Sequence, residues 1–175
     1  GVPRHLQYTG LLNRITMPKE AAIKLCSDII VQRQASHNRH AQEFPAFVHA
    51  YMTRKHAGDA AVWAYSLDEA TRVFDSDVNL HLFGLVSRRS LGEIMYAELR
   101  TDIAIFMEAC ESMDIMQHGE ANYTVPVAHA VGILVEMYPG YPDAAFRRII
   151  ENLNATLTTN GHAHYRMLFP NLERD

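Results

Sequence analysis

The 175-residue chain contains little cysteine, and neither of its two cysteines stands in a metal-binding or catalytic motif. Cys26 and Cys110 each fall within an apolar stripe of helical spacing, which predicts two buried thiols and no disulfide framework. Reduced thiols are typical of a reducing compartment, so we expect a cytoplasmic protein. No staple is required, because 175 residues of which 48% are hydrophobic can bury a sizeable core.

Long hydrophobic runs and long basic runs are also absent. No stretch approaches the roughly 20 apolar residues of a membrane span, and the start lacks a signal-peptide pattern. The formal net charge is −4 and the Lys and Arg residues are scattered, so the sequence has no electrostatic footprint for nucleic acid or an anionic membrane. We therefore expect neither a nucleic-acid partner nor membrane insertion. The chain begins with Gly1 and not with Met, which indicates a fragment of a larger polypeptide.

Motifs that carry catalysis are missing as well. The sequence has no glycine-rich loop that would cradle phosphate, no Gly-x-Ser-x-Gly elbow and no His-Glu-x-x-His motif. Its ten histidines raise the alternative of a His-dependent metal enzyme, since His37 and His40 lie one helical turn apart and His162 and His164 flank a single residue. That spacing alone is more typical of surface histidines. We therefore expect a protein that is not an enzyme and needs no cofactor.

Apolar periodicity predicts helices almost throughout the chain. After an irregular lead, helices are expected over residues 16–36 and 44–58. Asp59 stands where it would cap a third helix, and Asp77 where it would cap a buried helix over residues 78–86. This pattern places the chain in the all-α class.

A long helix after Ser90 has the strongest pattern. Ser90-Leu-Gly-Glu93 matches the capping box, in which a hydroxyl caps the helix and a carboxylate reaches back to it. Apolar residues then recur every three or four positions, at Leu91, Met95, Leu99, Ile103, Phe106, Cys110 and Met113. We expect this stripe to face the core.

Two loops in the second half of the chain have matching spacing. In the later loop, Gly161 stands at a sharp turn and Ala163 two residues after it is the central apolar position. Val125 lies 38 residues earlier, which is close to the repeat expected when two helix-loop-helix units pair through one short β-bridge. The sequence does not decide where the earlier loop begins. Counting back from Gly119 makes Asp114 its first residue, whereas counting back from Val125 makes His118 its first residue.

The region from about residue 90 to residue 169 resembles a degenerate EF-hand pair of the calmodulin-like type. An EF-hand loop binds calcium through oxygen ligands at its first, third and fifth positions and a bidentate Glu at its twelfth. The later loop holds Thr156, Thr158, Asn160 and Met167 at those positions, and neither frame of the earlier loop gives a carboxylate array. The resemblance therefore implies a pair that works without calcium.

The sequence thus predicts an N-terminal helical array, residues 1–87, packed on an EF-hand-like pair, residues 88–175, with a weakly marked boundary near residues 87–90. Methionines are concentrated in the second half, and flexible thioethers suit a groove for an amphipathic partner helix. We expect Met113, Met137 and Met167 to contribute to it. The expected function is a calcium-independent protein-interaction or assembly module, and the resemblance extends to modules of cytoskeletal or flagellar proteins. The alternatives are a calcium sensor with one irregular site around Asp114 and Glu120, and the metal enzyme.

Overall fold

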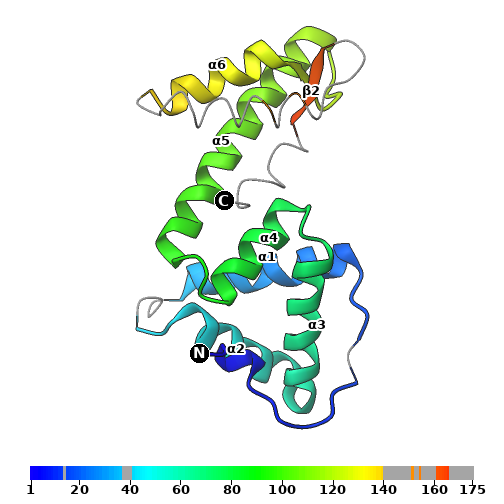
Figure 1. Cartoon of the computed structure of the whole chain (residues 1–175), viewed down its shortest axis with the longest axis vertical. Coiled ribbons are helices and arrows are strands. Elements are labelled where there is room, and N and C mark those ends of the chain that lie inside the picture. Colours follow the sequence, from blue (N-terminus) through cyan, green and yellow to red (C-terminus); the bar gives the residue numbers. More distant parts are fainter. Residues whose placement is uncertain (14, 37–40, 140–150, 152–153, 155–160, 166–175) are drawn as a thin grey trace. The chain divides into compact units, whose positions relative to one another are not determined.

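The protein is all-α, with a single two-stranded sheet among the described residues (Figure 1). The structure, a computed structural model, describes residues 1–13, 15–36, 41–139, 151, 154 and 161–165. The chain divides into two compact units, residues 1–97 and 98–175. This division falls inside a helix and not at the expected 87/88 boundary. Within the described ranges, no helix has the length and apolar character needed to cross a bilayer.

The described residues of unit 1 form four helices and the start of a fifth. They are α1 (Lys19–Ala35), α2 (Phe44–His56), α3 (Ala60–Val73), α4 (Val78–Ser87) and the first residues of α5 (Glu93–His118). Two short 3-10 turns accompany them, η1 (Arg4–Leu6) and η2 (Ala57–Asp59). The helices enclose a core whose largest fully buried apolar side chains are Ile29, Val48, Met52, Leu80 and Phe83. The expected helices of this half are therefore present, including a buried helix at residues 78–87.

The two predicted helix caps have different outcomes. Asp77 caps α4 as expected, because its Oδ1 accepts hydrogen bonds from the backbone N–H groups of Asn79 at 3.1 Å and Leu80 at 3.3 Å. Asp59 stands at the start of α3 but makes no side-chain hydrogen bond there. The prediction for Asp59 was therefore wrong, since the preceding 3-10 turn already leads the chain into the helix.

The predicted capping box at Ser90 does not form, because α5 begins at Glu93 and the Glu93 carboxylate binds elsewhere. Arg33, buried on α1, donates from Nε and Nη2 to the two carboxylate oxygens, each at 2.7 Å, and also from Nη2 to the Gln42 carbonyl at 2.6 Å. A buried guanidinium without a carboxylate would be strongly unfavourable. Pairing with Arg33 therefore stabilises the fold more than a helix cap by Glu93 would. Glu93 therefore fastens the first turn of α5 to α1.

Only part of the apolar stripe predicted for α5 is buried in the core. Phe106 and Cys110 are fully buried, and both cysteines are free buried thiols as expected. Met95 is 51% exposed, so its placement in the core was wrong. The neighbouring Tyr96 is buried instead, with its ring 6.3 Å from that of Phe44. An aromatic ring next to Phe44 buries more apolar surface than a methionine, and this sets the rotation of the helix.

The irregular lead of the chain forms an N-terminal strap, which we define as residues 1–17 apart from residue 14. Its 3-10 turn packs against α2 and α3 (blue in Figure 1). The Tyr65 hydroxyl donates a hydrogen bond to the Leu6 carbonyl and accepts one from the Tyr8 N–H, and the Ile15 N–H donates to Ser66 Oγ at 2.9 Å. Pro3, His5 and Met17 are the buried side chains of the strap, and much of the rest is exposed.

Unit 2 contains the remainder of α5, strand β1 (Thr124–Pro126), helix α6 (Val127–Met137) and strand β2 (His162–His164). Gly119, with φ +79°, lets the chain leave the end of α5. The core of the unit is a cluster of Phe106, Cys110, Val125, Ala130, Leu134, Ala163 and Tyr165. A further apolar stripe of helical spacing in the sequence lies outside the described residues, at Ala145, Ile149, Ile150, Leu153 and Leu157.

Candidate functional site

A β-bridge joins the two loops of unit 2. Strands β1 and β2 pair antiparallel with Val125 opposite Ala163, Thr124 opposite His164 and Pro126 opposite His162. Val125 and Ala163 are both fully buried. The pairing expected from the 38-residue spacing is thereby confirmed, down to the two central residues.

The two loops also share a backbone conformation. Gly161, two residues before Ala163, has φ +73°, and Tyr123, two residues before Val125, has φ +59°. A positive φ is easy for glycine but strained for a bulky side chain, so the fold imposes this geometry on Tyr123. The bridge thus sets the frame of the earlier loop, which starts at His118 when counted back from Val125. Its third, fifth and twelfth positions are then Glu120, Asn122 and His129, which give no carboxylate array.

Asp114, one helical turn before His118, is the organising residue of the earlier loop. Its side chain is fully buried. Oδ1 lies 2.9 Å from His118 Nδ1, and Oδ2 accepts a hydrogen bond from the Tyr165 hydroxyl at 3.3 Å. The backbone N–H groups of Asn122, Tyr123 and Thr124 also donate to the carboxylate. Successive amides that converge in this way form an anion-binding nest.

The electrostatics of this centre follow from its donors. Burial raises the pKa of Asp114, but the hydrogen bonds from His118 and from the backbone of residues 122–124 outweigh burial and hold the pKa below its ordinary value. The carboxylate is therefore ionised at neutral pH. Burial, together with the Asp114 charge, raises the pKa of the Cys110 thiol to about 12. Cys110 is thus a protonated, unreactive core thiol.

The four histidines of unit 2 are His118, His129, His162 and His164. The rings of His118 and His162 are 6.2 Å apart between centroids, and His129 Nδ1 lies 3.3 Å from Gln117 Nε2. No group of three or more His, Cys, Asp or Glu side chains is placed to hold a metal ion in the part of the chain that the structure describes. His37 and His40 lie outside the described residues.

The proposed partner-binding methionines stand at the border of the core. Met113 and Met137 are partly buried and pack against the cluster around Phe106. Met167 lies outside the described residues. Near Met137, the Tyr138 hydroxyl donates a 2.5 Å hydrogen bond to Asp102 Oδ2, which ties the end of α6 to the middle of α5. Two of the three sequence-predicted residues therefore share one cluster.

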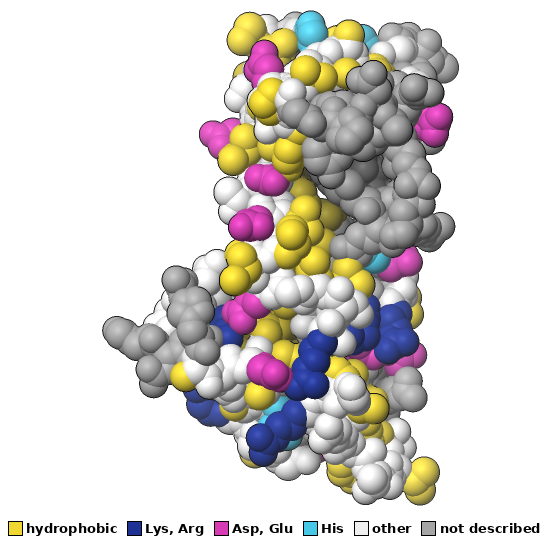
Figure 2. Space-filling model, turned by 60° about the vertical axis from the view of Figure 1, so that its left-hand side comes forward, with side chains coloured by type: hydrophobic (Ala, Val, Ile, Leu, Met, Phe, Trp, Pro, Cys, Tyr) yellow, Lys and Arg dark blue, Asp and Glu magenta, His cyan; other side chains and the backbone are white. Residues whose placement is uncertain are grey.

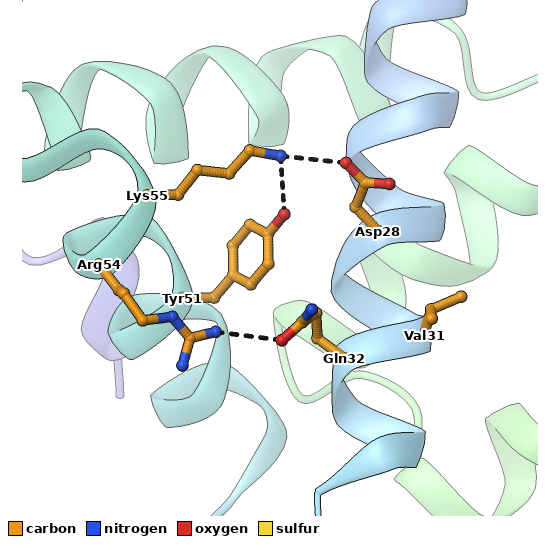
Figure 3. Close-up of a pocket in the computed structure, with 6 residues that line it drawn as sticks. All are labelled: Asp28, Val31, Gln32, Tyr51, Arg54 and Lys55. Atoms are coloured by element: carbon orange, nitrogen blue, oxygen red, sulfur yellow. Dashed lines mark hydrogen bonds and ion pairs between the residues drawn. The ribbon is translucent and has the colours of Figure 1, made fainter.

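A hollow in unit 1 lies between α1 and α2 (Figure 3). Asp28 and Gln32 point toward it from α1, and Tyr51, Arg54 and Lys55 from α2. Lys55 Nζ lies 3.0 Å from Asp28 Oδ2 and 2.8 Å from the Tyr51 hydroxyl, and these two hydrogen bonds raise the pKa of Lys55. The polar groups bind one another across the hollow, so we interpret it as a tie between two helices.

The sequence identified the bridge but missed the role of Asp114, which it treated as a candidate calcium ligand. Two signals were available. Asp114 and His118 have the i, i+4 spacing at a helix end, and Tyr123 stands where the later loop has Gly161. No protein-family model, curated protein or solved structure matches the chain.

Proposed function

We propose that the chain is a calcium-independent, non-catalytic protein-interaction module in which a degenerate EF-hand-like pair holds an amphipathic partner helix. The observation that carries this proposal is the Asp114 centre. A calcium loop directs oxygen atoms toward a cation, whereas here backbone amides converge on a carboxylate of the protein itself. An internal anion thus organises the loop, and its geometry does not depend on an added ion.

The same centre argues against the calcium-sensor alternative. A cation at Asp114 would have to displace His118, Tyr165 and the backbone amides, all of which already surround a fully buried carboxylate. Glu120, the other candidate ligand, is exposed on the surface. The metal-enzyme alternative gains no support from the arrangement of the described histidines.

The surface of unit 2 supports a role in protein contact. Ile105, Ile115 and Met116 on α5 are 49%, 45% and 76% exposed, and Figure 2 shows hydrophobic and acidic side chains along this helix. The Lys and Arg side chains visible in the same view are concentrated over unit 1. Exposed apolar groups that gather on one surface are typical of interaction sites. Assignment to a cytoskeletal or flagellar assembly belongs to the same proposal and rests on the resemblance alone.

Calcium should leave the thermal stability unchanged. A ligand that binds only the folded state raises the melting temperature by mass action, so an absent site gives no shift. We expect the same Tm, measured by circular dichroism, in millimolar calcium and in excess chelator. A clear rise of Tm with calcium would contradict the proposal.

Polar substitution at the border methionines should weaken capture of a helix. We expect Met113→Gln and Met137→Gln each to lower the affinity for an amphipathic Leu/Lys/Glu model peptide of zero net charge by about tenfold, which corresponds to ~1.4 kcal/mol. Fluorescence anisotropy measures the affinity, in chelator and in calcium. Met95→Gln, at an exposed methionine of unit 1, is the matched control.

Each contrary result has a defined meaning. Equal losses in Met95→Gln would show that the effect is nonspecific, and loss of binding in chelator would show that a functional calcium site exists. Binding that is unchanged in both unit 2 variants would show that the methionines only fill the core.

A further inference from the structure

His5 is the polar side chain that the N-terminal strap buries most deeply. It is 5% exposed, although it belongs to a segment whose neighbours Arg4, Gln7 and Tyr8 are exposed. A backbone hydrogen bond joins the ring to Pro45 at the start of α2. The other ring nitrogen, Nδ1, is buried and has no hydrogen-bond partner. A neutral imidazole fits this site, but an imidazolium would bury an N–H group without an acceptor.

The charged groups around His5 act on an added proton in opposite directions, and burial has a larger effect than any of them. His49 faces it from α2 and Arg88 from the end of α4, and both disfavour a positive charge. Asp68 on α3 favours it, but the carboxylate of Asp68 already binds Arg88 at 2.9 Å and Arg72 at 3.1 Å. The Asp68 carboxylate is thus shared with two guanidinium groups.

Among the described residues, the strap is also held by the buried Pro3 and Met17, by the two hydrogen bonds at Tyr65 and by the Ile15–Ser66 bond. The strap supplies none of the most deeply buried side chains of unit 1, which come from the helices. Release of the strap would therefore leave the helical core largely intact.

We propose that His5 is an acid-released latch, in which protonation of its imidazole detaches the N-terminal strap from α2 and α3 while the helices of unit 1 stay folded. This inference concerns unit 1 and does not depend on the function proposed for unit 2. Its consequence is a protein that exposes the α2–α3 surface under the strap only in a mildly acidic environment.

The direction of the pH effect follows from the two states of His5. Burial lowers the pKa of His5 from 6.5 to about 4, and the released strap returns the ring to its ordinary value. Between those values the released state binds a proton that the docked state does not. Acidification therefore favours release, and the docked state is fully favoured only above about pH 6.5.

Hydrogen exchange measured by NMR tests the latch. The Leu6 N–H, bonded to Pro3 O at 2.9 Å, and the Ile15 N–H report on the strap, and the Phe83 N–H reports on the core. From pH 7.5 to pH 5 we expect the protection factors of the strap amides, corrected for intrinsic exchange, to fall about 30-fold. Protection at Phe83 should stay constant.

Variants separate the latch from general acid sensitivity. In His5→Phe and in the smaller His5→Leu, the pH dependence of strap protection should disappear, whereas His129→Gln, at an exposed histidine of unit 2, should keep it. Unchanged strap protection in the native protein, or the same fall in the His5 variants, would overturn the proposal. An equal loss of protection at Phe83 would overturn it too, because unit 1 would then unfold as a whole. If neither variant folds, the titration of His5 in the native protein decides, and an ordinary pKa would refute the latch.

Discussion

Replacing Asp114 with alanine should lower the free energy of unfolding of unit 2 by about 3–5 kcal/mol. The substitution leaves three successive backbone N–H groups, the His118 ring and the Tyr165 hydroxyl without their common acceptor. These donors are held by the fold and cannot all turn toward water, so each retains part of its desolvation cost. Urea denaturation followed by circular dichroism measures the loss.

The Asp114→Asn variant separates the contribution of the negative charge to stability from that of the side-chain shape. The amide keeps one oxygen acceptor, so we expect a smaller loss than for alanine. Because the folded-state pKa of Asp114 lies below its ordinary value, its carboxylate stabilises the fold at neutral pH and loses this effect as the pH falls below about 4. The asparagine variant should lack that acid-dependent component.

Glu111 provides the matched control for Asp114. It lies on the same helix but is exposed, so Glu111→Ala should change the stability by no more than about 0.5 kcal/mol. Comparable losses at the two positions would show that Asp114 has no special role. Recovery of the Asp114→Ala variant by calcium would show that the loop can still be organised by a cation.

Phe106→Ala should be similarly severe, with a loss of about 3–5 kcal/mol. Phe106 is 1% exposed and belongs to the cluster that includes Val125 and Ala163, so its removal opens a cavity against the bridge. Chemical denaturation of the variant gives the value, and the exchange rate of the Val125 amide shows whether the cavity loosens the bridge.

The neighbouring residue tests the rotation of α5. Ile105 is 49% exposed, and Ile105→Ala should cost less than about 1 kcal/mol because little apolar contact is lost. A loss at Phe106 below about 1 kcal/mol, or an equal loss at Ile105, would mean that the helix presents a different face to the core.

The helices of unit 1 could be predicted because each buries one apolar stripe, and such stripes are visible in a single sequence. The errors arose where side chains from distant segments compete. Glu93 has the local pattern of a capping box, yet Arg33, 60 residues earlier, takes its carboxylate. Met95 has the right period for the core, yet Tyr96 fills the space beside Phe44. Neither partner can be identified from local periodicity.

The bridge between Val125 and Ala163 could be predicted because its signal is a distance along the chain. At Asp114 the spacing to His118 was visible in the sequence, but the contribution of the backbone N–H groups was not, since no side chain reveals their direction. The burial of His5 could not be predicted either. It stands in a segment without periodicity, where nothing in the sequence separates a buried histidine from an exposed one.

Helix α5 begins in one compact unit and ends in the other, which limits how the protein can be dissected. A cut at residue 87 keeps α5 whole but deprives Arg33 of Glu93, so the N-terminal piece would carry a buried guanidinium without its counter-ion. A cut at residue 97 keeps that pair but truncates α5 and creates a new helix start with unbonded amides. Two separately expressed halves would therefore not reproduce the stability of the intact chain, because either cut damages one of the two pieces.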